Sequence, residues 1–134
     1  MCRRTPAGGE HVTSDGKSDV AVFLPRNYLR PCLLLLLAEG TAHGYELLDQ
    51  TSKLGLPNVD PGGLYRCLRA MDEEGLVDSR WEPSSIGPAR RTYALTREGR
   101  DWLRAVSASL AQVHGILELF QHRLQRLEVR DTVI

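Results

Sequence analysis

Two arginines one helical turn apart, Arg66 and Arg69, are the side chains of this sequence best suited to bind another molecule. A guanidinium group can donate two parallel hydrogen bonds to guanine O6 and N7 or to phosphate oxygens. Tyr65 lies beside them and can donate its hydroxyl to a phosphate. Gly62 and Gly63 come just before and remove side-chain bulk where the first turn of a helix can approach DNA closely. These residues are therefore candidates for a contact with DNA.

Arg90 and Arg91 form a second basic pair, next to a segment rich in proline, serine and glycine. One of them can follow the phosphate backbone or enter a minor groove. Successive residues of a strand point to opposite sides. We therefore expect at most one of the two in the groove and a structural role for the other.

A plainer interpretation of the first pair is also open. Arg66 and Arg69 can solvate an exposed helix face and pair with Asp72 or Glu73 at helical spacing. The chain has seventeen basic and seventeen acidic side chains, so its overall field does not attract nucleic acid or an anionic membrane. Any binding to DNA must come from local patches.

The first pair belongs to a segment with strong helix signals. Asp60 is a suitable capping residue, Pro61 suits the first helical position and Gly75 ends the helix. The apolar residues recur at helical spacing and predict one buried stripe, made of Leu64, Cys67, Leu68 and Met71. The predicted helix thus anchors one side in a core and turns its arginines outward.

The flanking segments predict two earlier helices and a hairpin. The first helix ends at about Glu39, and the second covers Thr41 to Leu54 with Thr41 as its cap. Strands are expected over Leu76 to Glu82 and Arg90 to Leu95. Three short helices followed by a two-stranded hairpin are the order of a winged helix-turn-helix, whose third helix enters a DNA major groove. The predicted fold is mainly α with a small β hairpin.

A long helix capped by Thr96 follows the hairpin. Its apolar residues alternate spacings of three and four and form a heptad seam, made of Leu103, Val106, Leu110, Val113, Leu117, Phe120, Leu124 and Leu127. So small a domain cannot cover this seam, which predicts a homodimer. A two-fold dimer would bind a pseudo-palindromic site on double-stranded DNA. The alternative is that the helix folds back onto its own domain.

The sequence thus predicts a disordered arm over residues 1–19, a winged helix-turn-helix domain over 20–95 and a coiled-coil dimerisation helix over 96–130. Three cysteines without metal-ligand spacing favour a reducing cytoplasm and neither a disulfide framework nor a metal site. The apolar run 32–38 is too short to span a membrane. No catalytic grouping or cofactor motif is found, so we expect neither an enzyme nor a cofactor.

Several short segments resemble the PadR family of bacterial transcriptional regulators, in particular its compact subgroup with a single C-terminal dimerisation helix. The similarity runs over roughly 28–127. It lies in Leu34 to Gly40, His43-Gly44-Tyr45-Glu46-Leu47, Leu64-Tyr65-Arg66, Glu73-Glu74-Gly75-Leu76-Val77, Gly87-Pro88-Ala89-Arg90-Arg91, Tyr93, Leu95-Thr96 and Gly99. No one of these is specific, but the combination is.

The resemblance implies a homodimer that represses promoters and is released when a small hydrophobic effector binds near the dimerisation helices. Two positions differ from the family pattern. Gly63 stands where the family commonly has serine or threonine, so one hydroxyl contact to the DNA backbone is missing. Leu110 stands near the position of the tryptophan that stacks planar drugs in multidrug-responsive relatives. The competing hypothesis is a winged-helix adaptor that binds proteins and not DNA.

Overall fold

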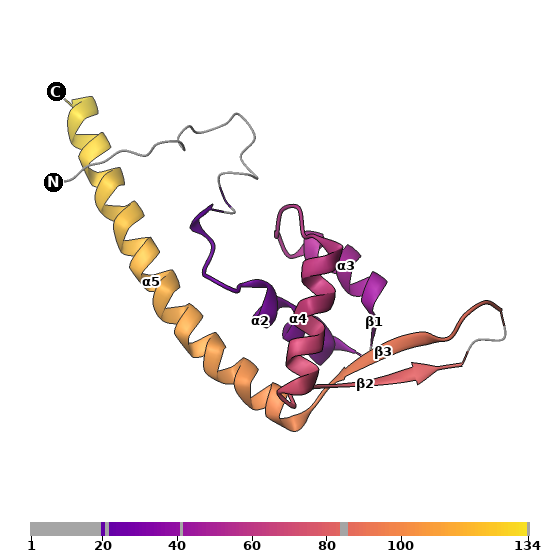
Figure 1. Ribbon diagram of the computed structural model, residues 1–134. Coiled ribbons are helices and arrows are strands. Elements are labelled where there is room, and N and C mark those ends of the chain that lie inside the picture. The colour runs from indigo at the N-terminus through magenta and orange to yellow at the C-terminus, as the bar shows by residue number, and fades with distance from the viewer. Residues whose placement is uncertain (1–19, 21, 41, 84–85, 134) are drawn as a thin grey trace, which may run out of the picture.

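The computed structural model describes residues 20, 22–40, 42–83 and 86–133, and the predicted arm over residues 1–19 lies outside the described residues. The elements are α2 (Leu29–Glu39), β1 (Ala42–His43), α3 (Gly44–Lys53), α4 (Pro61–Glu73), β2 (Val77–Glu82), β3 (Arg90–Leu95) and α5 (Arg97–Val133). Figure 1 shows α2, α3 and α4 grouped together, with the hairpin of β2 and β3 extending to one side and α5 to the other. This arrangement confirms the predicted winged helix-turn-helix with a long C-terminal helix.

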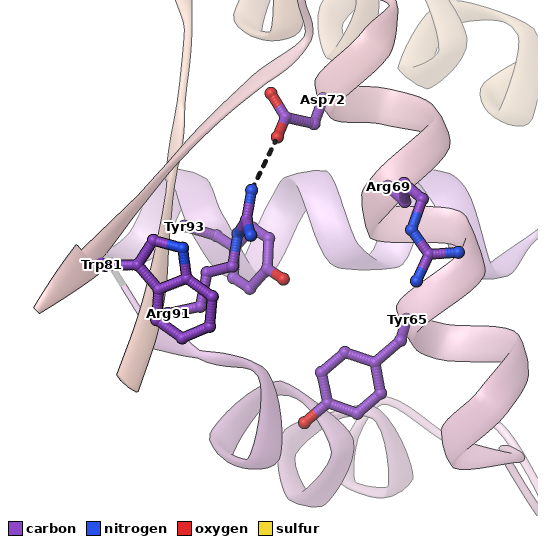
Figure 2. A pocket seen from close by; sticks show the side chains of 6 residues that line it. All are labelled: Tyr65, Arg69, Asp72, Trp81, Arg91 and Tyr93. Carbon is purple, nitrogen blue, oxygen red and sulfur yellow. Dashed lines mark ion pairs between the residues drawn. The ribbon is translucent and has the colours of Figure 1, made fainter. Parts of the chain in front are cut away.

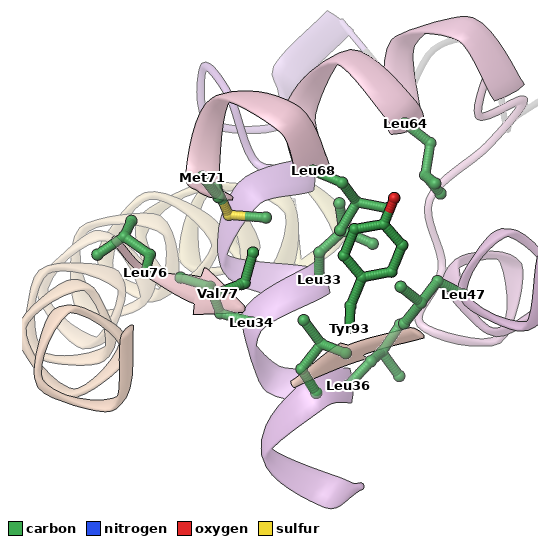
Figure 3. Packing of buried hydrophobic residues seen from close by; sticks show 11 residues of the cluster. Leu33, Leu34, Leu36, Leu47, Leu64, Leu68, Met71, Leu76, Val77 and Tyr93 are labelled. Carbon is green, nitrogen blue, oxygen red and sulfur yellow. The ribbon is translucent and has the colours of Figure 1, made fainter. Parts of the chain in front are cut away.

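The core forms around α2, whose leucine run is buried on almost every side. Leu33 and Leu34 are fully buried, and Leu36 and Leu37 nearly so. The core cluster is completed from α3, α4 and the hairpin by Leu47, Leu64, Leu68, Met71, Leu76, Val77 and Tyr93 (Figure 3). The predicted stripe of α4 is therefore the anchored side of that helix, although Cys67 is only partly buried.

The sheet has three strands in the order β1-β3-β2, and the sequence did not predict β1. Ala42 and His43 pair with Tyr93 and Thr92 of β3. The prediction of one helix from Thr41 to Leu54 is therefore wrong at its start, since α3 begins at Gly44. A two-residue strand carries no periodicity, and its pairing depends on residues about fifty positions away.

His43 is the residue that caps α3, whereas Thr41, the predicted cap, lies outside the described residues. The Glu46 carboxylate accepts a hydrogen bond from the backbone N–H of His43 at 2.8 Å. This bond and the nearby His43 ring lower the pKa of Glu46 below its usual range. The carboxylate therefore stays charged at the positive end of the helix dipole.

The bounds predicted for α4 are confirmed by its caps. The Asp60 carboxylate accepts a hydrogen bond from the Gly63 N–H at 2.9 Å, and Pro61 occupies the first turn. Gly75 follows the helix with φ at +83°, a conformation that glycine adopts without strain. The chain then turns directly into β2.

The start of α5 is tied to the end of α4. Thr96 accepts from the Gly99 N–H at 3.0 Å, as its predicted capping role requires, and donates to the Gly75 carbonyl at 2.6 Å. Gly99 is buried, and a side chain there would overlap the Leu76 carbonyl. The close approach at Gly99 therefore fixes the direction in which α5 leaves the domain.

Candidate nucleic-acid interface

The side of α4 opposite the core is exposed and basic. Arg66 and Arg69 are both exposed, and Arg66 makes a loose ion pair with Asp60 at 3.8 Å. Both partners of that pair are about 70% exposed, so the pair contributes little to stability. Neither arginine pairs with Asp72 or Glu73 within the described part of the chain. The pairing that the plainer interpretation expected is therefore not seen, whereas both arginines are exposed, as that interpretation also requires.

Tyr65 lies on the flank of α4 and packs against the start of α3. A Cβ atom added to Gly44 would overlap the Tyr65 ring and lie 2.7 Å from its hydroxyl oxygen. Gly44 therefore lets α4 approach α3, and the Tyr65 hydroxyl sits beside the first turn of α3. Sequence reasoning placed Tyr65 on the flank but missed this contact. The one feature of the sequence that could have indicated this contact is Gly44 itself, a glycine at the start of a helix where no turn requires one.

Arg90 lies on the hairpin and turns toward the start of α3. Its Nη1 donates to the Tyr45 hydroxyl at 3.1 Å, and its guanidinium carbon lies 5.8 Å from the Tyr45 ring centre. The His43 ring stacks on Tyr45 with centroids 5.5 Å apart, and its Nε2 lies 3.2 Å from Glu82. Arg90 therefore belongs to an exposed cluster that joins the hairpin to α3.

Arg91 turns the other way, toward α4. Its Nη2 donates to the Ser79 hydroxyl at 2.8 Å and lies 3.8 Å from the Asp72 carboxylate. Ser79 in turn donates to Asp72 at 2.7 Å, and the Arg91 guanidinium carbon lies 5.2 Å from the Trp81 ring centre. The expectation that the two arginines point to opposite sides is confirmed. Which of them enters a groove stays a prediction.

A cleft of about 290 Å³ separates α4 from the hairpin. Figure 2 shows its lining, in which side chains from α4 face side chains from the strands: Tyr65, Arg69, Asp72, Trp81, Arg91 and Tyr93. Burial raises the pKa of the Tyr93 phenol, so this group remains a neutral donor. Two guanidinium groups and two phenol hydroxyls make the cleft chemically suited to an anionic oxygen, with Asp72 as its one acid among the lining residues.

A bidentate ion pair holds the far end of α4. Arg30 of α2 donates to both carboxylate oxygens of Glu74 at 2.6 and 2.9 Å, and its guanidinium carbon lies 5.7 Å from the Trp102 ring centre. The hydrogen bond to Glu74 raises the pKa of Arg30, and the Arg30 guanidinium lowers the pKa of Glu74. This contact joins α2 and α5 to the residue that caps the C-terminus of α4, and no pattern in the sequence indicated it.

The predicted seam of α5 divides into two parts. Leu103, Val106 and Leu110 are partly buried, and line a cavity against Tyr28, Pro31, Cys32, Leu35 and Leu54. The rest of the seam is 38 to 68% exposed, namely Val113, Leu117, Phe120, Leu124 and Leu127. Ile116 and Leu119 are exposed beside it and were missed because they fall outside the strict heptad. The alternative of a helix folded back therefore applies only to the first turns of α5.

The fold and the basic face together define a winged-helix protein of the DNA-binding class. The model of the transcriptional regulator PadR-like family matches residues 33–105, which is more than half of the chain. The chain belongs to this family, which confirms the family resemblance and the prediction of a DNA-binding transcriptional regulator that is not an enzyme.

Solved structures agree with this assignment. A PadR-like regulator of Bacillus cereus is 30% identical, with a TM-score of 0.60 over 67% of this chain and 87% of that one. A PadR family regulator of Clostridium difficile is 24% identical, with a TM-score of 0.64 over 70% and 98% of the two chains. Bacillus subtilis PadR in complex with operator DNA is similar in fold, at 24% identity and a TM-score of 0.55 over 60% and 47%. None of the helices described here is long and apolar enough to cross a membrane.

Proposed function

We propose that this protein is a cytoplasmic, homodimeric repressor that binds a pseudo-palindromic DNA operator through the outward face of α4. The observation that supports this most directly is the division of α4 into two sides. Leu64, Leu68 and Met71 are fully buried, while Arg66 and Arg69 are exposed one turn apart. A helix anchored in this way can place guanidinium groups in a major groove without rearrangement of the core.

The first turn of α4 is also open to a close approach. Gly62 is exposed and Gly63 partly so, and no side chain of their own covers the helix start. The Asp60 carboxylate and carbonyl accept from the Gly63 and Leu64 N–H groups, so the Gly62 N–H and the positive end of the helix dipole are what favour a phosphate there. The hairpin adds Arg90 on one side and Arg91 on the other. Contacts from arginine to phosphate set the position of a protein on the duplex.

Dimerisation through α5 is supported by its uncovered apolar face. From Val113 onward the seam residues are exposed in the single chain, and Phe120 is 68% exposed. A contiguous apolar face of this kind is typical of a protein interface. A second copy packed along it would bury the seam and set the distance between the two α4 helices.

We also propose that a small hydrophobic effector releases the repressor from DNA, and the cavity between α2 and the first turns of α5 supports this. Its volume is about 340 Å³ and its lining is mainly apolar, with Cys32, Leu35 and Leu103 among its residues. A cavity of this size is within the range of small-molecule sites. Because its walls come from the domain and from the dimerisation helix, a hydrophobic ligand there can change the angle between them.

The experiment is a selection of genomic fragments by the purified protein, combined with a measurement of its size in solution. The proposal predicts a dimer and a set of fragments that share one two-fold symmetric sequence. The neutral overall charge favours the rival function, an adaptor for another protein. A monomer that enriches no fragment would support the adaptor and contradict the repressor.

A further inference from the structure

We propose that Asp72 is a positioning residue for DNA binding, which holds Arg91 of the hairpin ready for a backbone phosphate in the cleft beside α4. This inference rests on the proposed function, because it concerns the same DNA-facing surface. It adds a residue of the wrong charge for DNA to the binding machinery.

Among the described residues, the polar contacts of the Asp72 side chain lead to the hairpin. Its carboxylate accepts from the Ser79 hydroxyl at 2.7 Å, Ser79 accepts from Arg91 Nη2 at 2.8 Å, and Arg91 Nη2 lies 3.8 Å from the carboxylate. Trp81 covers the guanidinium from one side at 5.2 Å. Figure 2 shows the dashed ion pair that joins α4 to the strand across the cleft. Three residues thus fix the angle between the hairpin and α4.

The arrangement leaves Arg91 able to bind a further group. Both of its polar contacts with the described residues use Nη2, so the N–H groups of Nη1 and Nε remain for a ligand. The Arg91 side chain is 43% exposed, whereas that of Asp72 is 33% exposed. Arg69 and the phenol groups of Tyr65 and Tyr93 line the same cleft. The cleft volume of about 290 Å³ is several times larger than the space of about 30 Å³ that one water molecule takes. The cleft therefore has room for a phosphate group.

The sign of the charge separates this role from a simple electrostatic one. A carboxylate beside DNA repels the phosphates, so its removal by itself makes binding tighter. If Asp72 acts by holding Arg91, its removal makes binding weaker, because the guanidinium must then be ordered when DNA binds. The two roles predict opposite changes for the same substitution.

The experiment measures the affinity of the full chain for a short duplex of mixed sequence, over a range of salt concentrations. We expect Asp72→Asn to weaken binding about threefold to tenfold, which is the lower part of the range of coupling within one hydrogen-bonded network. The slope of log affinity against log salt should also become shallower, by up to about one for a lost phosphate contact. The control is Glu73→Gln, which removes the neighbouring exposed carboxylate of α4 and should leave affinity equal or slightly higher.

Two further variants separate positioning from damage to the fold. Ser79→Ala removes the bridging hydroxyl without a change of charge, and should also weaken binding. In an Arg91→Ala background, Asp72→Asn should no longer weaken binding, because no guanidinium remains to be held. Binding by Asp72→Asn that equals or exceeds that of the unmodified protein would overturn the inference and leave the proposed function standing.

A readout in the absence of DNA keeps the inference testable by itself. Asp72→Asn should speed hydrogen exchange of the hairpin amides, while exchange in the buried helix α2 stays unchanged. Unchanged exchange in the hairpin would overturn the positioning role. A protein that binds no duplex at all would overturn the proposed function and this inference together.

Discussion

Substitution of Gly63 by alanine should stabilise the free protein and weaken its binding to DNA. Gly63 lies in the first turn of α4 and its φ is not positive. An added Cβ would lie 3.6 Å from its nearest neighbours, Arg66 Nη2 and Asp60 Oδ2, which is ordinary van der Waals contact. The protein itself therefore has room for the methyl group.

The magnitude on the free protein follows from helix propensity. Alanine is favoured over glycine within a helix by about 0.5–1 kcal/mol. For a domain of this size, 1 kcal/mol shifts the Tm by about 4–8 °C. We expect the Tm of Gly63→Ala to rise by about 2–8 °C, measured by thermal unfolding followed by circular dichroism.

The magnitude on DNA binding follows from the close approach that the proposed function requires. An alanine methyl takes up space beside the DNA backbone without the hydroxyl that serine or threonine offers at this position in the family. A methyl group forced into a packed contact costs about 1–3 kcal/mol, which corresponds to a loss of affinity of about 5- to 150-fold. The control is Gly115→Ala in α5, where a Cβ meets nothing within 4 Å. It should give a similar rise in Tm and no loss of affinity. A stabilised Gly63→Ala variant that binds the operator with unchanged affinity would refute the reasoning.

Three other substitutions test separate parts of the structure. Gly44→Ala should displace the Tyr65 ring from α3 and weaken DNA binding in gel-shift titrations, with little loss of Tm because the ring can swing outward. Arg30 lowers the pKa of Glu74 in the folded state, so the stabilisation is present above the ordinary glutamate pKa of about 4.3 and is lost as the pH falls through the lower folded value. The Tm of the unmodified protein should thus exceed that of Glu74→Gln by its largest amount at neutral pH, and the two values should become equal in acid. A difference that does not change with pH would contradict this. Phe120→Asp should give a folded monomer by light scattering, because the side chain is 68% exposed in the single chain; a persistent dimer would contradict the seam.

The elements that were predicted well are those whose signals are local. Asp60, Pro61 and the apolar spacing from Leu64 to Met71 all lie within one segment, and α4 has the predicted bounds. The heptad spacing likewise revealed α5, since a helical period persists over many turns.

The features that were missed depend on residues far apart in the chain. β1 exists only because Ala42 and His43 reach β3, and Tyr65 contacts Gly44 twenty-one positions earlier. Helical spacing suggested Asp72 as a partner for the arginines of its own helix. The structure pairs Asp72 with Arg91, because the base of the hairpin lies beside the C-terminal end of α4. Which of several possible arginines pairs with a given carboxylate can be decided only from the tertiary fold.

The measurement that tests the central claim most directly is the operator affinity of Arg66→Ala and of Arg69→Ala. Each should lose about 1–3 kcal/mol of discrimination between the operator and unrelated DNA, if its guanidinium reads a base. Arg100→Ala removes another exposed arginine, from α5, and serves as the control, with no change expected. Folded Arg66→Ala and Arg69→Ala variants that both bind the operator as tightly and as selectively as the unmodified protein would contradict the assignment of α4 as the helix that reads DNA.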